Sequence, residues 1–233
     1  NKLAGYIENR DEVFCSGLFL SARWMVVSQL DHIGIQMIIL PDRDSAEYCA
    51  ADLYNLIEGD KVYFLPDSGK TLERSNYKSS LGVQRTSAVG KILEYEEGEQ
   101  MIVVTYPSAL EENIPDKGKI QGALLKLTVG EEKSYDEIIE VLFNNGFERV
   151  DFVAEPGQFA VRGALIDIFS YSFNNPFRIS FFGDEIDSIN VFDTNTQLSK
   201  EKVEYVDIYP DLSSDEEGEG VRITDILPES TLV

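Results

Sequence analysis

The residues with the most recognisable chemical spacing in this sequence are Ser68-Gly69-Lys70-Thr71, which match the last four positions of a phosphate-binding loop. In such a loop backbone amides hold the phosphates, and the lysine reaches the β- and γ-phosphates. The motif also requires a glycine five residues before its second glycine, but that position is Phe64. Pro66 lies inside the run, and no apolar helix pattern follows at once. We therefore predict a chance match that binds no nucleotide.

Groupings typical of catalysis or metal binding are scarce. His32 is the only histidine, and the two cysteines, Cys15 and Cys49, form no CxxC motif. A Ser-His-Asp triad and a zinc site both need more than this set provides. Asp184-Glu185 and Asp187 resemble an acid cluster, but in a chain with 42 acidic residues a charged turn is the simpler interpretation. We predict no catalytic residue, no metal, no cofactor and no enzyme activity.

Three arginines are the more informative chemical groups. Arg149, Arg162 and Arg178 are the only basic residues between Asn145 and Asp193, a stretch that is otherwise acidic. An arginine can donate two parallel hydrogen bonds to a carboxylate, and arginine is enriched at the centres of protein interfaces. The simpler alternative is that each arginine is a surface residue paired with Glu148, Asp151 or Glu155.

Composition limits the possible partners. The formal net charge of −22 disfavours direct binding to nucleic acid, because neutralising phosphates requires lysine and arginine. No apolar run reaches the ~18 residues expected of a membrane-spanning helix, and the chain starts without a signal-peptide pattern. We expect a cytoplasmic protein with no DNA contact and no membrane contact.

Around these arginines the sequence predicts an antiparallel meander. Three runs rich in β-branched and aromatic residues are bounded by turn residues: Gln158–Phe169, Phe177–Phe182 and Glu185–Phe192. Gly163 lies inside the first run, where a bulge or a close backbone approach is the usual reason. In Phe159–Arg162, alternation places Phe159 and Val161 on one face and Arg162 on the other.

The fold class predicted for the rest is α/β. In residues 1–112 short apolar strands (Gln36–Leu40, Val62–Leu65, Met101–Tyr106) alternate with helical spacing at Asp44–Ile57, which indicates a mostly parallel sheet covered on both faces. Glu111–Gly122 is predicted to be a polar linker. Residues 113–210 then form a small α+β domain, with strands at Leu124–Val129 and Val203–Tyr209 and a helix at Ser134–Asn144. Residues 211–233 are predicted to be an acidic loop followed by the truncated start of a return to the first domain.

The sequence of one long stretch resembles that of a known family. The segments RVDFV, EPGQFAVRGALIDIF and NPFRISFFGDEIDSINVFD are similar to the UvrB-homology module of bacterial transcription-repair coupling factors (Mfd), a related form of which occurs in UvrB. The resemblance extends from roughly Gly5 to Pro210. It implies a degenerate P-loop, RecA-like domain with a small α+β domain inserted into it. Where UvrB-like proteins carry Gly-Lys-Thr, this chain has Ser21-Ala22-Arg23, which implies a lost nucleotide site; the DNA-engaging hairpin of UvrB is also missing.

The resemblance also implies a partner and the residues that contact it. Modules of this kind use the small domain to bind UvrA, the damage-recognition ATPase of nucleotide excision repair. The matching contact positions are Arg149 and Arg162, with Arg178 as a weaker third and Phe159 as an apolar anchor. Other domains of the same full-length protein, which would supply a DNA-translocating ATPase, are further expected partners. Two alternatives remain open: a UvrB-like, ATP-dependent module that processes damaged DNA, and a different acidic adaptor on the same fold.

Overall fold

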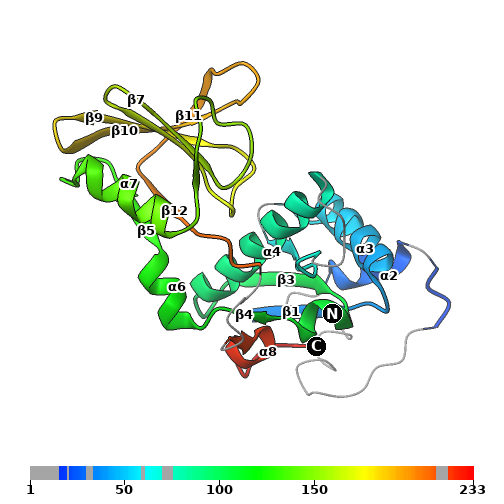
Figure 1. Ribbon diagram of the computed structural model, residues 1–233. Coiled ribbons are helices and arrows are strands. Elements are labelled where there is room, and N and C mark those ends of the chain that lie inside the picture. Colours follow the sequence, from blue (N-terminus) through cyan, green and yellow to red (C-terminus); the bar gives the residue numbers. More distant parts are fainter. Residues whose placement is uncertain (1–15, 20, 30–33, 59–60, 70–75, 214–219) are drawn as a thin grey trace.

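A computed structural model describes residues 16–19, 21–29, 34–58, 61–69, 76–213 and 220–233. His32, Cys15, Lys70 and Thr71, and with them part of the predictions above, lie outside the described residues. The chain forms an α/β part and a part built on an antiparallel sheet, joined through α6 (Lys117–Ala123) and a pair of strands (Figure 1). The mixed α/β class is confirmed, with both parallel and antiparallel sheets present.

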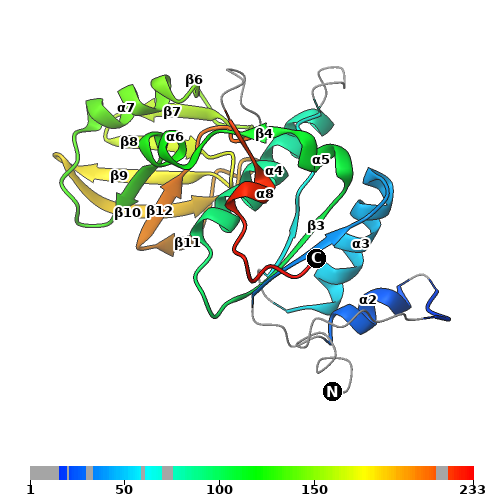
Figure 2. The same ribbon diagram turned by 90° about the horizontal axis from the view of Figure 1, so that it is seen from below.

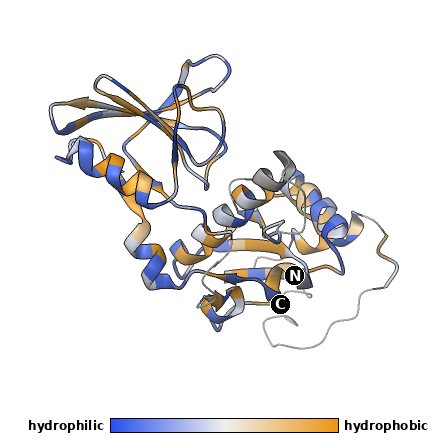
Figure 3. Ribbon diagram, in the orientation of Figure 1, coloured by the Kyte–Doolittle hydropathy of each residue, from blue (hydrophilic) through white to orange (hydrophobic). Residues whose placement is uncertain are grey.

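The α/β part is built on a parallel sheet of three strands in the order β1 (Gly34–Ile39), β3 (Gln100–Thr105), β2 (Val62–Phe64). Alternate residues of β3 enter different hydrophobic clusters: Ile102 and Val104 pack with residues of α3 (Arg43–Leu56), whereas Met101 and Val103 pack with residues of α4 (Asn76–Glu94). The sheet is therefore buried on both faces, which explains why its strands are continuously apolar. Figure 3 shows this hydrophobic colouring along the strands.

Two helices of this part differ from the prediction. The helix α3 begins at Arg43, one residue before the predicted start at Asp44, and its N-cap is Asp42, whose carboxylate accepts a hydrogen bond from the Ser45 amide at 2.8 Å. The 19-residue helix α4 was missed, because its serines, threonine and glycines dilute the apolar pattern. A short helix, α2 (Ala22–Val27), buries Trp24 against the same cluster as α3.

The second sheet has six strands in the order β11-β10-β9-β8-β7-β6. Their bounds are β6 (Glu148–Arg149), β7 (Gln158–Arg162), β8 (Leu165–Phe169), β9 (Phe177–Phe182), β10 (Glu185–Phe192) and β11 (Ser199–Val203). The run Gln158–Phe169 is thus two strands, and the predicted bulge at Gly163 is wrong. Gly163 has a φ of 59° and opens the two-residue turn between β7 and β8, a position that glycine fills without strain.

One face of this sheet carries the main core. The helix α7 (Tyr135–Asn144) and the antiparallel pair β5 (Leu125–Thr128) and β12 (Tyr205–Ile208) pack on it, and all the core residues of this cluster lie between Leu125 and Ile208. The predicted helix is confirmed, although the Ser134 side chain makes no capping hydrogen bond. Figure 3 shows α7 with both polar and apolar residues, as expected of a half-buried helix.

The predicted irregular linker is partly helical. After α5 (Pro107–Glu111) and β4 (Asn113–Ile114), α6 begins at Lys117, capped by Asp116, whose carboxylate accepts hydrogen bonds from the Gly118 and Lys119 amides. Near the end of the chain, β13 (Val221–Arg222) pairs with β4, and α8 (Ile223–Ile226) follows. The Leu232 carbonyl then accepts a hydrogen bond from the Met37 amide of β1 at 2.7 Å. Figure 2 shows this C-terminal segment beside β1.

A buried arginine of α4 binds both segments of the chain that connect the α/β part with the antiparallel part. Arg85 of α4 is fully buried, and its guanidinium donates to four backbone carbonyls. The acceptors, at 2.7 to 3.1 Å, are those of Pro66, Ala109, Glu112 and Ser213. Since Glu112 precedes the antiparallel part and Ser213 follows it, Arg85 fixes both connections to the same helix.

Candidate protein-interaction surface

Two of the three arginines, Arg162 and Arg178, lie on the outer face of the antiparallel sheet, which is the face opposite α7. Arg149 pairs with Phe159 and therefore lies at the sheet edge on the α7 side. Cross-strand register places Asp167 of β8 between Ala160 of β7 and Arg178 of β9. Since directly paired residues share a face, Asp167 and Arg178 point the same way. Arg162 of β7 is two residues from Ala160 and therefore lies on that face as well. The sheet thus gathers one carboxylate and two guanidiniums from three strands.

These groups form a compact ion-pair cluster. The Arg178 Nε donates to Asp167 Oδ1 at 2.7 Å, and an Arg178 terminal nitrogen donates to Oδ2 at 2.9 Å. Arg162 also donates to Oδ2. The Asp167 side chain is 1% exposed, whereas those of Arg162 and Arg178 are 35% and 20% exposed. The hydrogen bonds that Arg178 donates to Asp167 raise the pKa of the guanidinium above its ordinary value, so the charge of Arg178 is constant at physiological pH.

Each of the two guanidiniums also packs on an aromatic ring. The Arg162 guanidinium lies 5.1 Å from the centre of the Phe152 ring, and that of Arg178 lies 4.5 Å from the centre of Phe192. Arginine stacks readily on such rings. Phe192 is fully buried in a small cluster on this face, whereas Phe152 is 65% exposed. Arg162 is therefore both accessible and restrained.

Arg149 reaches the same area from the neighbouring strand. Arg149 and Arg162 line one surface hollow of about 760 Å³, together with Val150, Asp151, Phe152 and Val161. Arg149 is exposed, and the described part of the chain gives its side chain no hydrogen bond or ion pair. The sequence alternative that Arg162 pairs with Glu148, Asp151 or Glu155 is wrong, because its partner is Asp167. That Arg149, Arg162 and Arg178 bind a partner stays a prediction.

The predicted apolar anchor is wrong. Phe159 is 0% exposed, and its ring packs edge-on against Phe143 with centroids 5.1 Å apart, so it has no surface to offer. Phe182, at the end of β9, is instead 82% exposed. Phe177, Ile179 and Phe181 are buried at alternate positions of β9, and this pattern, visible in the sequence, would have placed Phe182 outward on the face of Arg162.

The candidate phosphate loop is occupied by carboxylates. The Ser68 amide and hydroxyl donate to Glu112 at 2.6 and 2.9 Å, and the Gly69 amide donates to Asp67 at 3.0 Å. Asp67 in turn receives a hydrogen bond from Arg43 at 2.5 Å. Two negative groups thus take the amides that would have to bind a phosphate, which agrees with a chance match of the motif.

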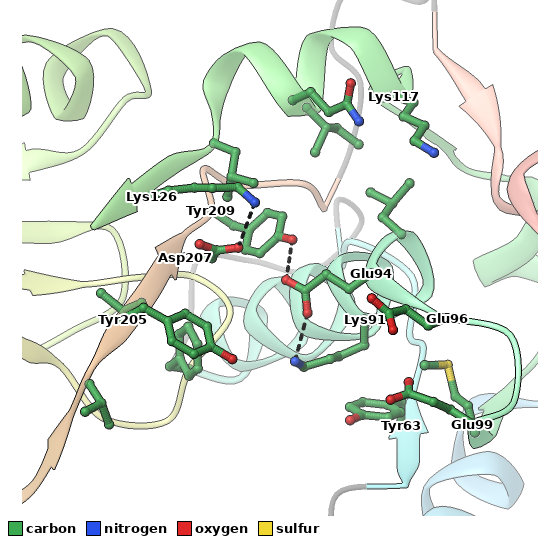
Figure 4. A pocket seen from close by; sticks show the side chains of 18 of the residues that line it. Tyr63, Lys91, Glu94, Glu96, Glu99, Lys117, Lys126, Tyr205, Asp207 and Tyr209 are labelled. Carbon is green, nitrogen blue, oxygen red and sulfur yellow. Dashed lines mark hydrogen bonds and ion pairs between the residues drawn. The ribbon is translucent and has the colours of Figure 1, made fainter. Parts of the chain in front are cut away.

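A larger cleft lies at the junction of the two parts. It has a volume of about 1170 Å³ and is lined by residues of α4, α6, β5 and β12 (Figure 4). Tyr209 donates to Glu94 at 2.6 Å, and Glu94 is also paired with Lys91 at 2.9 Å. Lys126 and Asp207 form a further pair at 3.6 Å. Three further acids, Glu96, Glu99 and Glu204, and one further base, Lys117, line the cleft, so its charge disfavours an anionic ligand.

Within the described residues no helix is long and apolar enough to cross a membrane, and no group of three or more His, Cys, Asp or Glu side chains is placed to hold a metal ion.

Comparison with known proteins defines the class. Residues 125–213, which contain the antiparallel sheet and its arginines, match the family model of the UvrB interaction domain. The chain is similar to transcription-repair-coupling factors over most of its length. It is 30% identical over 209 residues to that of Bacillus subtilis, covering 88% of this chain and 18% of the relative. For Mycobacterium tuberculosis the identity is 31% over 186 residues (77% and 15%), and for Escherichia coli it is 40% over 91 residues (39% and 8%). The chain thus spans less than a fifth of the length of each of these relatives.

Proposed function

We propose that this chain is a non-catalytic interaction module that recruits UvrA, the damage-recognition protein of nucleotide excision repair, to stalled transcription complexes. The observation that carries the proposal is the hollow that Arg149 and Arg162 line together, in a region that matches the family model of the UvrB interaction domain and in a chain of net charge −22. Exposed arginines at one place on so acidic a protein favour an acidic partner surface.

Restraint of Arg162 supports the proposal. Asp167 and the Phe152 ring already limit the conformations of its guanidinium, so binding loses less side-chain entropy than it would with a free arginine. Phe152 and Phe182 provide exposed apolar surface on the same face, which a partner can cover. An accessible arginine that stacks on an exposed aromatic ring has the composition of an interface centre.

The absence of nucleotide chemistry is part of the same proposal. The carboxylates that bind the Ser68 and Gly69 amides argue against a phosphate there, and Ser21-Ala22-Arg23 lacks the lysine of a working loop. We expect no saturable binding when the chain is titrated with labelled ATP and Mg²⁺ up to millimolar concentrations. Saturable binding would favour the UvrB-like, ATP-dependent alternative.

The decisive test is capture of purified UvrA by the immobilised chain. The variant Arg149→Glu/Arg162→Glu should abolish capture, because charge reversal places like charges across the contact. A matched control is Lys117→Glu/Lys202→Glu, which changes the net charge equally at exposed positions on α6 and on β11, the opposite edge of the sheet. Arg162→Glu sets a second carboxylate beside Asp167 and should lower the thermal melt, so capture is measured well below the melting temperatures of both variants. Capture by the control with loss by the arginine variant then supports the proposal. Equal capture by both variants contradicts it.

A further inference from the structure

The hollow between the two arginines contains an open strand edge. The Glu148 amide donates to the Gly157 carbonyl at 2.8 Å, and the Val150 amide donates to the Phe159 carbonyl at 2.9 Å. The carbonyls of residues 157 and 159 therefore face β6. Backbone groups alternate between the two sides of a strand, so Val161 turns its N–H and C=O the same way.

Nothing in the described chain pairs with Val161 on that side. The β6 ladder ends at Arg149, and the chain leaves the edge after Val150. On the other side, Arg162 faces Leu165 and Ala160 faces Asp167 across the β7–β8 hairpin, which satisfies the backbone groups of those two residues. Val161 thus presents one donor and one acceptor to the hollow, between two arginine side chains.

We infer that this edge is the place where an extended acidic segment of the partner adds as a short strand. An open edge recognises an extended chain through main-chain hydrogen bonds, and side chains on either side of it give specificity. Here the flanking side chains are Arg149 and Arg162, and Asp151 is the one acid lining the hollow. Arg162 shares Asp167 with Arg178, so three arginines face two acids, Asp151 and Asp167, and the remaining positive charge favours carboxylates on the incoming segment. The inference rests on the proposed function and adds how the partner is bound.

Backbone donation can be tested separately from charge. Val161→Pro removes an N–H that makes no hydrogen bond in the free chain, and proline is tolerated at strand edges where its nitrogen faces outward. Val161→Ala, the matched control, trims the side chain and keeps the N–H. We expect the proline variant to bind UvrA at least about tenfold more weakly than the alanine variant, with similar thermal melts.

Amide hydrogen exchange on the unmodified chain gives a second measurement that does not depend on the proline variant folding. The Val161 amide should exchange fast in the free chain and slowly in the complex with UvrA, whereas the Ala160 and Arg162 amides should already be protected by the hairpin. Capture of UvrA with Val161 still exchanging fast would overturn the inference and leave the proposed function standing. If the Val161 amide becomes protected as the concentration of this chain rises without UvrA, the edge pairs with a second copy of the chain, which would also overturn the inference. Failure of the unmodified chain to capture UvrA would overturn both proposals.

Discussion

The substitution Asp167→Asn tests how the arginine surface is held. It keeps the shape of the side chain but removes the charge that Arg162 and Arg178 share. A hydrogen bond to a charged group contributes ~1.5–3 kcal/mol, and breaking a buried ion pair removes ~3–5 kcal/mol. Both guanidiniums are partly exposed and can be rehydrated, so the lower end applies. We expect a loss of ~2–3 kcal/mol in the free energy of unfolding.

Urea denaturation followed by far-UV circular dichroism measures this loss. Fluorescence is less suitable, because the single tryptophan, Trp24, lies in the α/β part. Asp187→Asn is the matched control, since Asp187 is exposed on the same sheet, and it should change stability by less than ~0.5 kcal/mol. Equal midpoints for the two variants would refute the claim that Asp167 holds the arginines in place.

Three further outcomes follow from other contacts. Gly157→Ala should destabilise the chain by ~2 kcal/mol or more in urea denaturation, because Gly157 has a φ of 83° and a Cβ there would overlap the Tyr171 hydroxyl; alanine at the β7–β8 turn glycine, which has open space, should cost less. Arg85→Leu should cost ~3 kcal/mol or more, because it leaves four buried carbonyls without their donor, and an unchanged melt would contradict the structure. Burial acts to raise the pKa of Asp67, but hydrogen bonds, chiefly from Arg43, lower it on balance below its usual 3.8. The ionised Asp67 side chain therefore contributes its full stability above pH 3.8 and loses it as pH falls through its lowered folded-state pKa. The difference in unfolding free energy between wild type and Asp67→Asn should shrink as pH falls below 3.8, and a constant difference would contradict the pairing.

Long apolar patterns predicted the fold well. The strands of the parallel sheet are buried on both faces, so they are continuously apolar in the sequence, and α7 has a regular apolar face. Residue composition alone did not show where one strand ends and the next begins. The run Gln158–Phe169 has strand composition throughout, and only the left-handed conformation of Gly163 shows that it folds back on itself.

The candidate surface was predictable only in part. Composition and spacing singled out the arginines, but the carboxylate that holds two of them, Asp167, looked like any other acid in the sequence. Its role depends on the pairing of three strands, which brings residues 162, 167 and 178 together. Phe159 and Phe182 have the same chemistry, and only their positions in their strands separate a core residue from an exposed one.

An equilibrium titration of UvrA with this chain tests the central claim most directly. Losing an interface-centre arginine typically costs ~2 kcal/mol or more, so the two charge reversals, Arg149→Glu and Arg162→Glu, should together raise Kd by about a thousandfold or abolish binding. The control Lys117→Glu/Lys202→Glu should stay within about threefold of wild type, since exposed charges away from the contact matter little. A wild-type chain that does not bind UvrA, or an arginine variant that binds as well as the lysine control, would contradict the account.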